Sequence, residues 1–103
     1  MCGIIGISSN KSVSASIINS LKKLEYRGYD SAGIATLSDG EINEVKSEGR
    51  VDSLEKNFDL KNLKGNIGIG HVRWATHGVP NSVNAHPHSS YNVSVVHNGI
   101  IEN

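Results

Sequence analysis

The order in which short apolar runs and one longer amphipathic run follow each other most constrains the fold of this chain. Apolar side chains recur at the three- and four-residue spacing of an amphipathic helix at Val13, Ile17, Ile18, Leu21 and Leu24. Five short runs have the length and the residue types of β-strands, namely residues 2–7, 34–37, 42–46, 66–74 and 91–97. The order strand, helix, hairpin, helix, strand, loop, strand predicts an α+β fold with mostly antiparallel strands.

Local signals place the boundaries of these elements. Asn10 is expected to cap the first helix, because its side chain can accept a hydrogen bond from a backbone N–H at a helix start. The polar, glycine-containing residues 26–33 are expected to form a loop that leads into the second strand. Asp39-Gly40 predicts a tight hairpin between the second and third strands. A second, short helix is expected over Val51, Leu54 and Phe58.

Composition limits the size of the fold and its environment. A chain of 103 residues forms at most one small domain, and its ten basic and ten acidic residues give no reason to expect a nucleic acid or an anionic membrane as partner. No apolar run is long enough to span a bilayer, and the N-terminus lacks the features of a signal peptide. The single cysteine excludes an internal disulfide, so a cytoplasmic location is expected. The hydrophobic content of 37% is low, so the chain is not expected to close a core by itself.

Cys2 is the first candidate for chemistry. Removal of Met1 would leave a residue that carries both a thiol and a free α-amine. An α-amine titrates near pH 8 and can act as a general base beside a nucleophile. The alternative is that Cys2 is a small, buried apolar residue, and the first three residues alone favour that alternative.

Two further candidates lie at the ends of predicted strands. Arg73 ends one strand and opens the long irregular segment 75–90, where its guanidinium could bind a carboxylate through two parallel N–H···O bonds. The alternative is a solvated arginine. Asn98 and Gly99 follow the last predicted strand, and an amide side chain next to a backbone N–H can form an oxyanion hole. Asn-Gly is, however, also a common turn.

The remaining polar clusters favour simpler interpretations. Arg27 and Asp30 flank Gly28 and could form a surface ion pair of little energetic value. The five histidines could bind zinc, but they lack helical i, i+4 spacing and acidic neighbours. We therefore expect no metal and no cofactor. The histidines are instead expected to form hydrogen bonds with the backbone; they are His71, His77, His86, His88 and His97.

Five motifs, in this order and at this spacing, resemble the class II glutamine amidotransferases. They are residues 1–6 (MCGIIG), 24–33 (LEYRGYDSAG), 71–78 (HVRWATHG), 84–88 (NAHPH) and 96–103 (VHNGIIEN). The second and third motifs are similar to the branch of this family that makes an amino sugar, more than to its purine-pathway relatives. The resemblance covers the chain from Cys2 to Asn103.

The resemblance implies an N-terminal nucleophile hydrolase fold, in which two antiparallel sheets lie between helical layers (αββα). It implies that Cys2 attacks the side-chain amide of L-glutamine and that ammonia passes to a synthase half, which converts fructose 6-phosphate to glucosamine 6-phosphate. By the same resemblance, Asn98 and Gly99 form the oxyanion hole. Arg27 supports the surroundings of the nucleophile, and the glutamine and ammonia site is formed by Arg73, Trp74, Thr76 and His77.

The resemblance also implies that residues 1–103 are only part of a glutaminase domain. The rest of that domain and the sugar-isomerase domains, through which fructose 6-phosphate would bind, are then absent, and the parent enzyme is expected to be a homo-oligomer. With Met1 attached, the α-amine of Cys2 lies in a peptide bond, so residues 1–103 alone are expected to be inactive. Two alternatives stay open: another class II glutamine amidotransferase, and a truncated piece without catalytic function.

Overall fold

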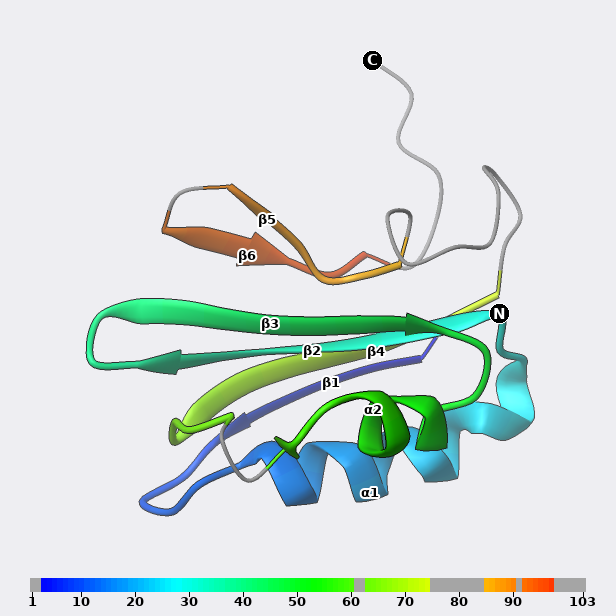
Figure 1. Ribbon diagram of the computed structural model, residues 1–103, viewed down its shortest axis with the longest axis horizontal. Coiled ribbons are helices and arrows are strands. Elements are labelled where there is room, and N and C mark those ends of the chain that lie inside the picture. Colours follow the sequence, from blue (N-terminus) through cyan, green and yellow to red (C-terminus); the bar gives the residue numbers. More distant parts are fainter. Residues whose placement is uncertain (1–2, 61–62, 75–84, 91, 98–103) are drawn as a thin grey trace.

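A computed structural model describes residues 3–60, 63–74, 85–90 and 92–97 of the chain (Figure 1). A four-stranded sheet forms the middle layer, with helices α1 (Ser14–Leu24) and α2 (Asp52–Asn57) on one face. A two-stranded hairpin lies over the other face. The described residues therefore form three layers in the order helices, sheet, second sheet.

The middle layer contains β1 (Gly3–Ser8), β2 (Ser31–Ser38), β3 (Glu41–Glu48) and β4 (Ile67–Arg73). Its strand order is β1-β4-β2-β3, and every neighbouring pair is antiparallel. The hairpin of the third layer pairs β5 (His88–Ser90) with β6 (Val93–Val95), also antiparallel. The predicted strands and their antiparallel arrangement are confirmed within the described residues. The expectation that segment 75–90 is irregular throughout is wrong, because its last three residues form β5.

The turn between β2 and β3 is the hairpin that Asp39-Gly40 predicted. Asp39 has φ 52° and Gly40 has φ 77°. A two-residue turn needs positive φ at both residues if it is to match the twist of the two strands that it joins. The second helix is also confirmed, but residues 26–33 differ from the expectation. They comprise a short 3-10 helix, Glu25–Arg27, and the first part of β2.

The expected N-cap at Asn10 is wrong. Helix α1 begins at Ser14, and Val13 occupies the cap position without a side-chain hydrogen bond. Backbone bonds position the chain before the helix instead, because Ser9 N donates to Asn66 O at 2.8 Å and Val13 N donates to Gly65 O at 3.0 Å. These bonds come from a segment more than fifty residues later, which a local signal cannot reveal.

The core lies between the helices and the sheet. The predicted apolar face of α1 is confirmed, since Val13, Ile17, Ile18 and Leu21 are buried. On β4 the side that faces α1 carries Gly68 and Gly70, and an added Cβ at Gly70 would lie 2.6 Å from Ile17 Cγ2. These two glycines allow the helix to lie directly against the strand.

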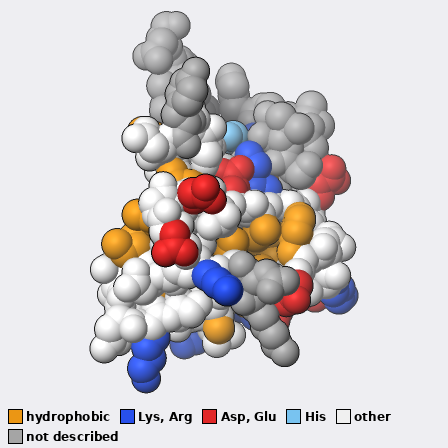
Figure 2. Space-filling view, turned by 60° about the vertical axis from the view of Figure 1, so that its left-hand side comes forward, with side chains coloured by type: hydrophobic (Ala, Val, Ile, Leu, Met, Phe, Trp, Pro, Cys, Tyr) orange, Lys and Arg blue, Asp and Glu red, His pale blue; other side chains and the backbone are white. Residues whose placement is uncertain are grey.

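The opposite face of the sheet is less covered. Ile67, Leu37 and Ile4 are 46%, 41% and 43% exposed, and Figure 2 shows hydrophobic side chains at this surface of the molecule. A hollow of about 180 Å³ lies between this face and the hairpin, lined by Ala35, Thr36, Leu37, Ile42, Ile67, Gly68, Ile69, Asn92 and Ser94. Neither helix of the described residues is long and apolar enough to cross a membrane.

Candidate active site

Four strand termini meet at one end of the middle sheet. There β1 and β2 begin and β3 and β4 end, because Gly3 pairs with Val72 and Ser31 pairs with both Arg73 and Glu48. Figure 1 shows this end next to the C-terminal end of α1. The described residues of three motifs far apart in the sequence, namely 3–6, 24–33 and 71–74, therefore lie close to one another.

Arg73 is the last residue of β4 and lies within this end of the sheet. It is 8% exposed, so the alternative of a solvated arginine is wrong. Its carbonyl oxygen accepts a hydrogen bond of 2.7 Å from Asp30 N. The residue that leads into β2 is therefore fixed directly against the candidate carboxylate-binding residue.

Trp74 follows Arg73 and packs on the turn that contains Gly28. A Cβ at Gly28 would lie 3.0 Å from Trp74 Cδ2, and Gly28 also has φ 114°. Both the ring and the backbone angle therefore require glycine at this position. Arg27 ends the 3-10 helix and immediately precedes Gly28, so its backbone belongs to the same turn. The indole itself is 49% exposed.

Asp30 connects the strands at this end of the sheet. Its Oδ1 accepts a hydrogen bond of 2.9 Å from Ser31 Oγ, and its carbonyl oxygen accepts one of 2.8 Å from Gly49 N. These contacts give Asp30 a role in joining β2, β3 and β4, which the interpretation as a surface ion pair with Arg27 missed.

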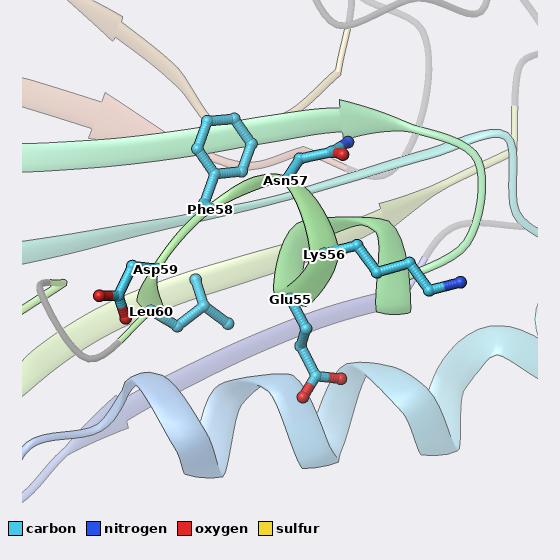
Figure 3. Close-up of a pocket in the computed structure, with 6 residues that line it drawn as sticks. All are labelled: Glu55, Lys56, Asn57, Phe58, Asp59 and Leu60. Atoms are coloured by element: carbon cyan, nitrogen blue, oxygen red, sulfur yellow. The ribbon is translucent and has the colours of Figure 1, made fainter.

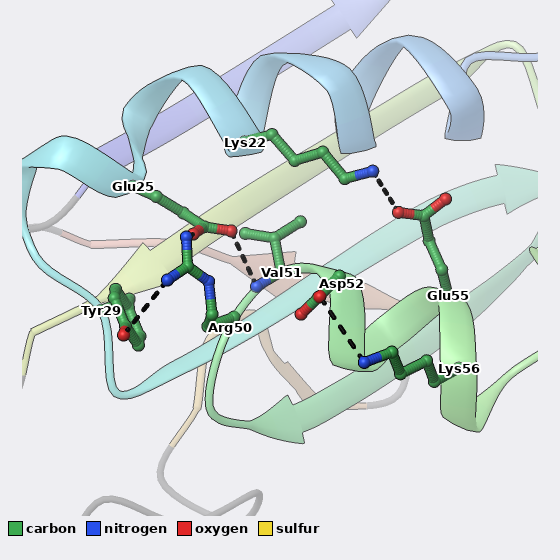
Figure 4. Close-up of polar contacts among 8 residues, drawn as sticks. All are labelled: Lys22, Glu25, Tyr29, Arg50, Val51, Asp52, Glu55 and Lys56. Atoms are coloured by element: carbon green, nitrogen blue, oxygen red, sulfur yellow. Dashed lines mark hydrogen bonds and ion pairs between the residues drawn. The ribbon is translucent and has the colours of Figure 1, made fainter.

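Glu25 is a positioning residue that sequence reasoning also missed (Figure 4). Its Oε1 accepts a hydrogen bond of 3.0 Å from Val51 N, and its Oε2 lies 3.0 Å from Arg50 Nη2. Arg50 in turn lies over Tyr29, with Cζ 4.9 Å from the ring centroid. These contacts connect the turn at residues 25–30 to the start of α2. No local signal marks them, because the acceptor for Val51 N lies 26 residues earlier in the chain.

Three histidines lie together where the hairpin meets the sheet. His71 is fully buried, its ring stacks on that of His86 with centroids 4.2 Å apart, and His86 lies 4.4 Å from His88. Burial lowers the pKa of His71 to about 4 and that of His86 to about 3. Both rings are therefore neutral at physiological pH.

These histidines do not make a metal site within the part of the chain that the structure describes. No group of three His, Cys, Asp or Glu side chains there is arranged to hold a metal ion. His71 bonds a backbone carbonyl instead, since its Nε2 lies 2.9 Å from His97 O. The expectation that histidines bond the backbone is confirmed for His71.

A second hollow, of about 560 Å³, lies beside the end of α2 and is lined by residues 55–60 (Figure 3). None of the candidate site residues lines it. Five candidates from the sequence fall outside the described residues: Cys2, Thr76, His77, Asn98 and Gly99.

Comparison with known proteins decides the relationship. The chain is 57% identical over 103 residues to the glutamine–fructose-6-phosphate aminotransferase (isomerizing) of Mesorhizobium japonicum, and 58% identical over 105 residues to that of Clostridium acetobutylicum. Each alignment covers the whole of this chain. This chain is a homologue of the glutamine–fructose-6-phosphate aminotransferases. It spans 17% of the length of these relatives, and no family model matches it.

Solved structures agree with this homology. The glutamine phosphoribosylpyrophosphate amidotransferase of B. subtilis, solved with ADP and GMP, is 31% identical, with a TM-score of 0.72 over 91% of this chain and 20% of that one. A structure described as the allosteric regulatory enzyme of purine biosynthesis matches with the same TM-score over 84% of this chain. The expected fold class is confirmed: the chain has the mixed α/β fold of the N-terminal nucleophile amidotransferases.

Proposed function

We propose that this chain supplies the glutamine-hydrolysing part of an enzyme that makes glucosamine 6-phosphate and glutamate from fructose 6-phosphate and glutamine. Residues 1–103 then form part of the glutaminase domain, and the sugar-phosphate domains lie elsewhere in a longer, oligomeric protein. The names and the lengths of the relatives support this proposal, because the chain corresponds to 17% of each.

The observation that carries the proposal is the position of Arg73. It is buried at the end of the sheet where β1 begins, and its neighbour Val72 pairs with Gly3, the residue bonded to Cys2. In the sequence Cys2 directly precedes β1, and Arg73 is the last residue of β4, the strand that pairs with β1. Arg73 would bind the α-carboxylate of glutamine, while the side-chain amide of the same substrate reaches the thiol.

The proposed reaction follows from the chemistry of a thiol with a free α-amine. The amine of Cys2 accepts the thiol proton, and the sulfur attacks the amide carbon of glutamine. An S–C bond forms, the C–N bond then breaks, and ammonia leaves with the transferred proton. Water hydrolyses the resulting thioester to glutamate and restores the thiol.

The other candidates have supporting parts in this proposal. Asn98 and Gly99 donate hydrogen bonds to the oxygen on which negative charge develops, a contribution that typically reaches a hundredfold in rate or more. Thr76 and His77 complete the glutamine-binding loop. Arg27 supports the nucleophile, and Trp74, which packs on the Gly28 turn, separates the glutamine site from the path of ammonia.

Replacement of the nucleophile tests the proposal. In the full-length protein with Met1 removed, Cys2→Ala should lower glutamate release from glutamine by at least about a thousandfold, because no other group of the site replaces the thiol. Glutamine-independent isomerisation of fructose 6-phosphate is the control, and it should continue in the same variant. Unchanged glutamate release would contradict the proposed function.

A further inference from the structure

Two segments of the third layer contact the middle sheet at one pair of facing residues. These are Gly33 of β2 and His71 of β4. The first segment contains His86, whose carbonyl oxygen would lie 2.1 Å from a Cβ at Gly33. Any side chain at Gly33 would therefore displace the His86 backbone. The second segment ends at His97, whose carbonyl oxygen lies 2.9 Å from His71 Nε2.

The hydrogen-bonding partner of His71 defines its tautomer. A carbonyl oxygen only accepts, so the proton of the ring lies on Nε2. Burial lowers the pKa of His71 to about 4, and a neutral ring carries no second proton. Its Nδ1 is buried and has no partner among the residues that the structure describes, which agrees with a lone pair at that atom. The His71 ring thus donates one hydrogen bond, to His97.

This bond connects the sheet to the residue that immediately precedes Asn98. Other support for the end of the hairpin is weak, because β5 and β6 have three residues each and Val93 and Val95 are 56% and 52% exposed. The contact of Ser89 Oγ with Glu44, also between hairpin and sheet, is exposed to solvent. The donor end of the His71 bond is different, because the His71 ring is fully buried and water has less access to it.

We propose that His71 is a positioning residue for the oxyanion hole. Its N–H holds the carbonyl group of His97, the residue that directly precedes Asn98 and Gly99 in the chain. This inference rests on the proposed function, because it assigns the oxyanion hole to Asn98 and Gly99. Loss of the bond should reduce transition-state stabilisation and leave glutamine binding by Arg73 largely unchanged.

Two replacements separate the hydrogen bond from the volume of the side chain. His71→Phe keeps a ring that can stack on His86 but has no N–H, whereas His71→Gln keeps an N–H donor. In the full-length protein with Met1 removed, we expect His71→Phe to lower kcat for glutamine hydrolysis about tenfold to a hundredfold. KM for glutamine should stay within about threefold, and His71→Gln should recover most of kcat.

His88 offers a matched control, because its ring also contacts that of His86, whereas the bond to His97 comes from His71. His88→Gln should leave kcat within about twofold of the unaltered protein. If His71→Phe and His88→Gln lower kcat equally, the loss reflects the histidine stack, and the positioning role is wrong.

An aldehyde analogue of glutamine gives a second readout. The thiolate of Cys2 adds to the aldehyde carbon, an S–C bond forms, and the electron pair of the C=O bond moves to the oxygen, which then lies in the oxyanion hole. The affinity of His71→Phe for this analogue should fall by the same factor as kcat, while inhibition by glutamate stays unchanged. Parallel losses for the aldehyde and for glutamate would indicate a merely structural role and overturn the inference.

The tautomer of His71 can be measured without any variant. In protein labelled with ¹⁵N-histidine, the shifts of His71 at neutral pH should show a protonated Nε2 and an unprotonated Nδ1, and the opposite pattern would overturn the inference. If the unaltered protein fails to hydrolyse glutamine, the proposed function is wrong. If it hydrolyses glutamine and His71→Phe has the same kcat, only the positioning role is wrong.

Discussion

Burial strengthens the interaction that Arg73 can make with a carboxylate. The residue is 8% exposed, and the effective dielectric constant falls as water is excluded, so opposite charges attract each other more strongly than in solution. A guanidinium also presents two parallel N–H groups that match the two oxygens of a carboxylate. Arg73 is thus suited to select a substrate with a free carboxylate.

Removal of the Arg73 guanidinium should weaken glutamine binding. A charge-assisted bidentate contact of this kind contributes about 2–4 kcal/mol, so Arg73→Ala should raise KM for glutamine by at least about thirtyfold. Steady-state kinetics in the full-length protein measure this effect. Arg73→Lys keeps the positive charge but loses the two parallel N–H groups, so it should give an intermediate KM. An unchanged KM in Arg73→Ala would exclude carboxylate binding by Arg73.

The sequence made Arg73 a candidate because an arginine at a strand end beside a long loop is a local pattern. The contacts of Glu25 with Val51 and of His71 with His97 have no such pattern, because 26 residues separate the partners in each case. Their roles depend on which strands lie next to each other, and this is information that one sequence without homologues does not contain.

Among the elements, the contact between α1 and β4 depends on residues without side chains. Periodicity predicted β4 from the alternation of Ile67 and Ile69 with Gly68 and Gly70, but it did not indicate which side of the strand faces the helix. In the structure the glycine side faces α1, because Ile17 fills the space above it. The larger isoleucines lie on the side of the hairpin, where Ile67 is 46% exposed.

A methyl group at this contact should therefore destabilise the fold. A Cβ at Gly70 would lie 2.6 Å from Ile17 Cγ2 and 3.1 Å from both Ile5 and Leu21, so Gly70→Ala should lower the free energy of unfolding by about 1–3 kcal/mol. Gly6→Ala on the neighbouring strand β1 is the control, since its nearest contact is 3.9 Å away. Equal thermal unfolding midpoints for the two variants would contradict this account of the contact.

At the scale of the whole molecule, the sheet order β1-β4-β2-β3 brings the candidate residues together. Strand content, the hairpin and the apolar face of α1 follow from local residue patterns and could be predicted. Strand order could not, because it depends on pairing between β1 and β4, which are separated by almost sixty residues. That pairing places Gly3, the first residue of β1, beside the end of β4.

The central claim is that Cys2 is a nucleophile at this end of the sheet, and covalent labelling tests it most directly. A chloromethyl ketone analogue of glutamine loses chloride when a thiolate attacks its methylene carbon, and the adduct can be located by peptide mass spectrometry. We expect a single adduct, on Cys2, that glutamine prevents and that forms far more slowly when Met1 is retained. An adduct on a histidine, or labelling of Cys2 that glutamine does not prevent, would contradict the claim.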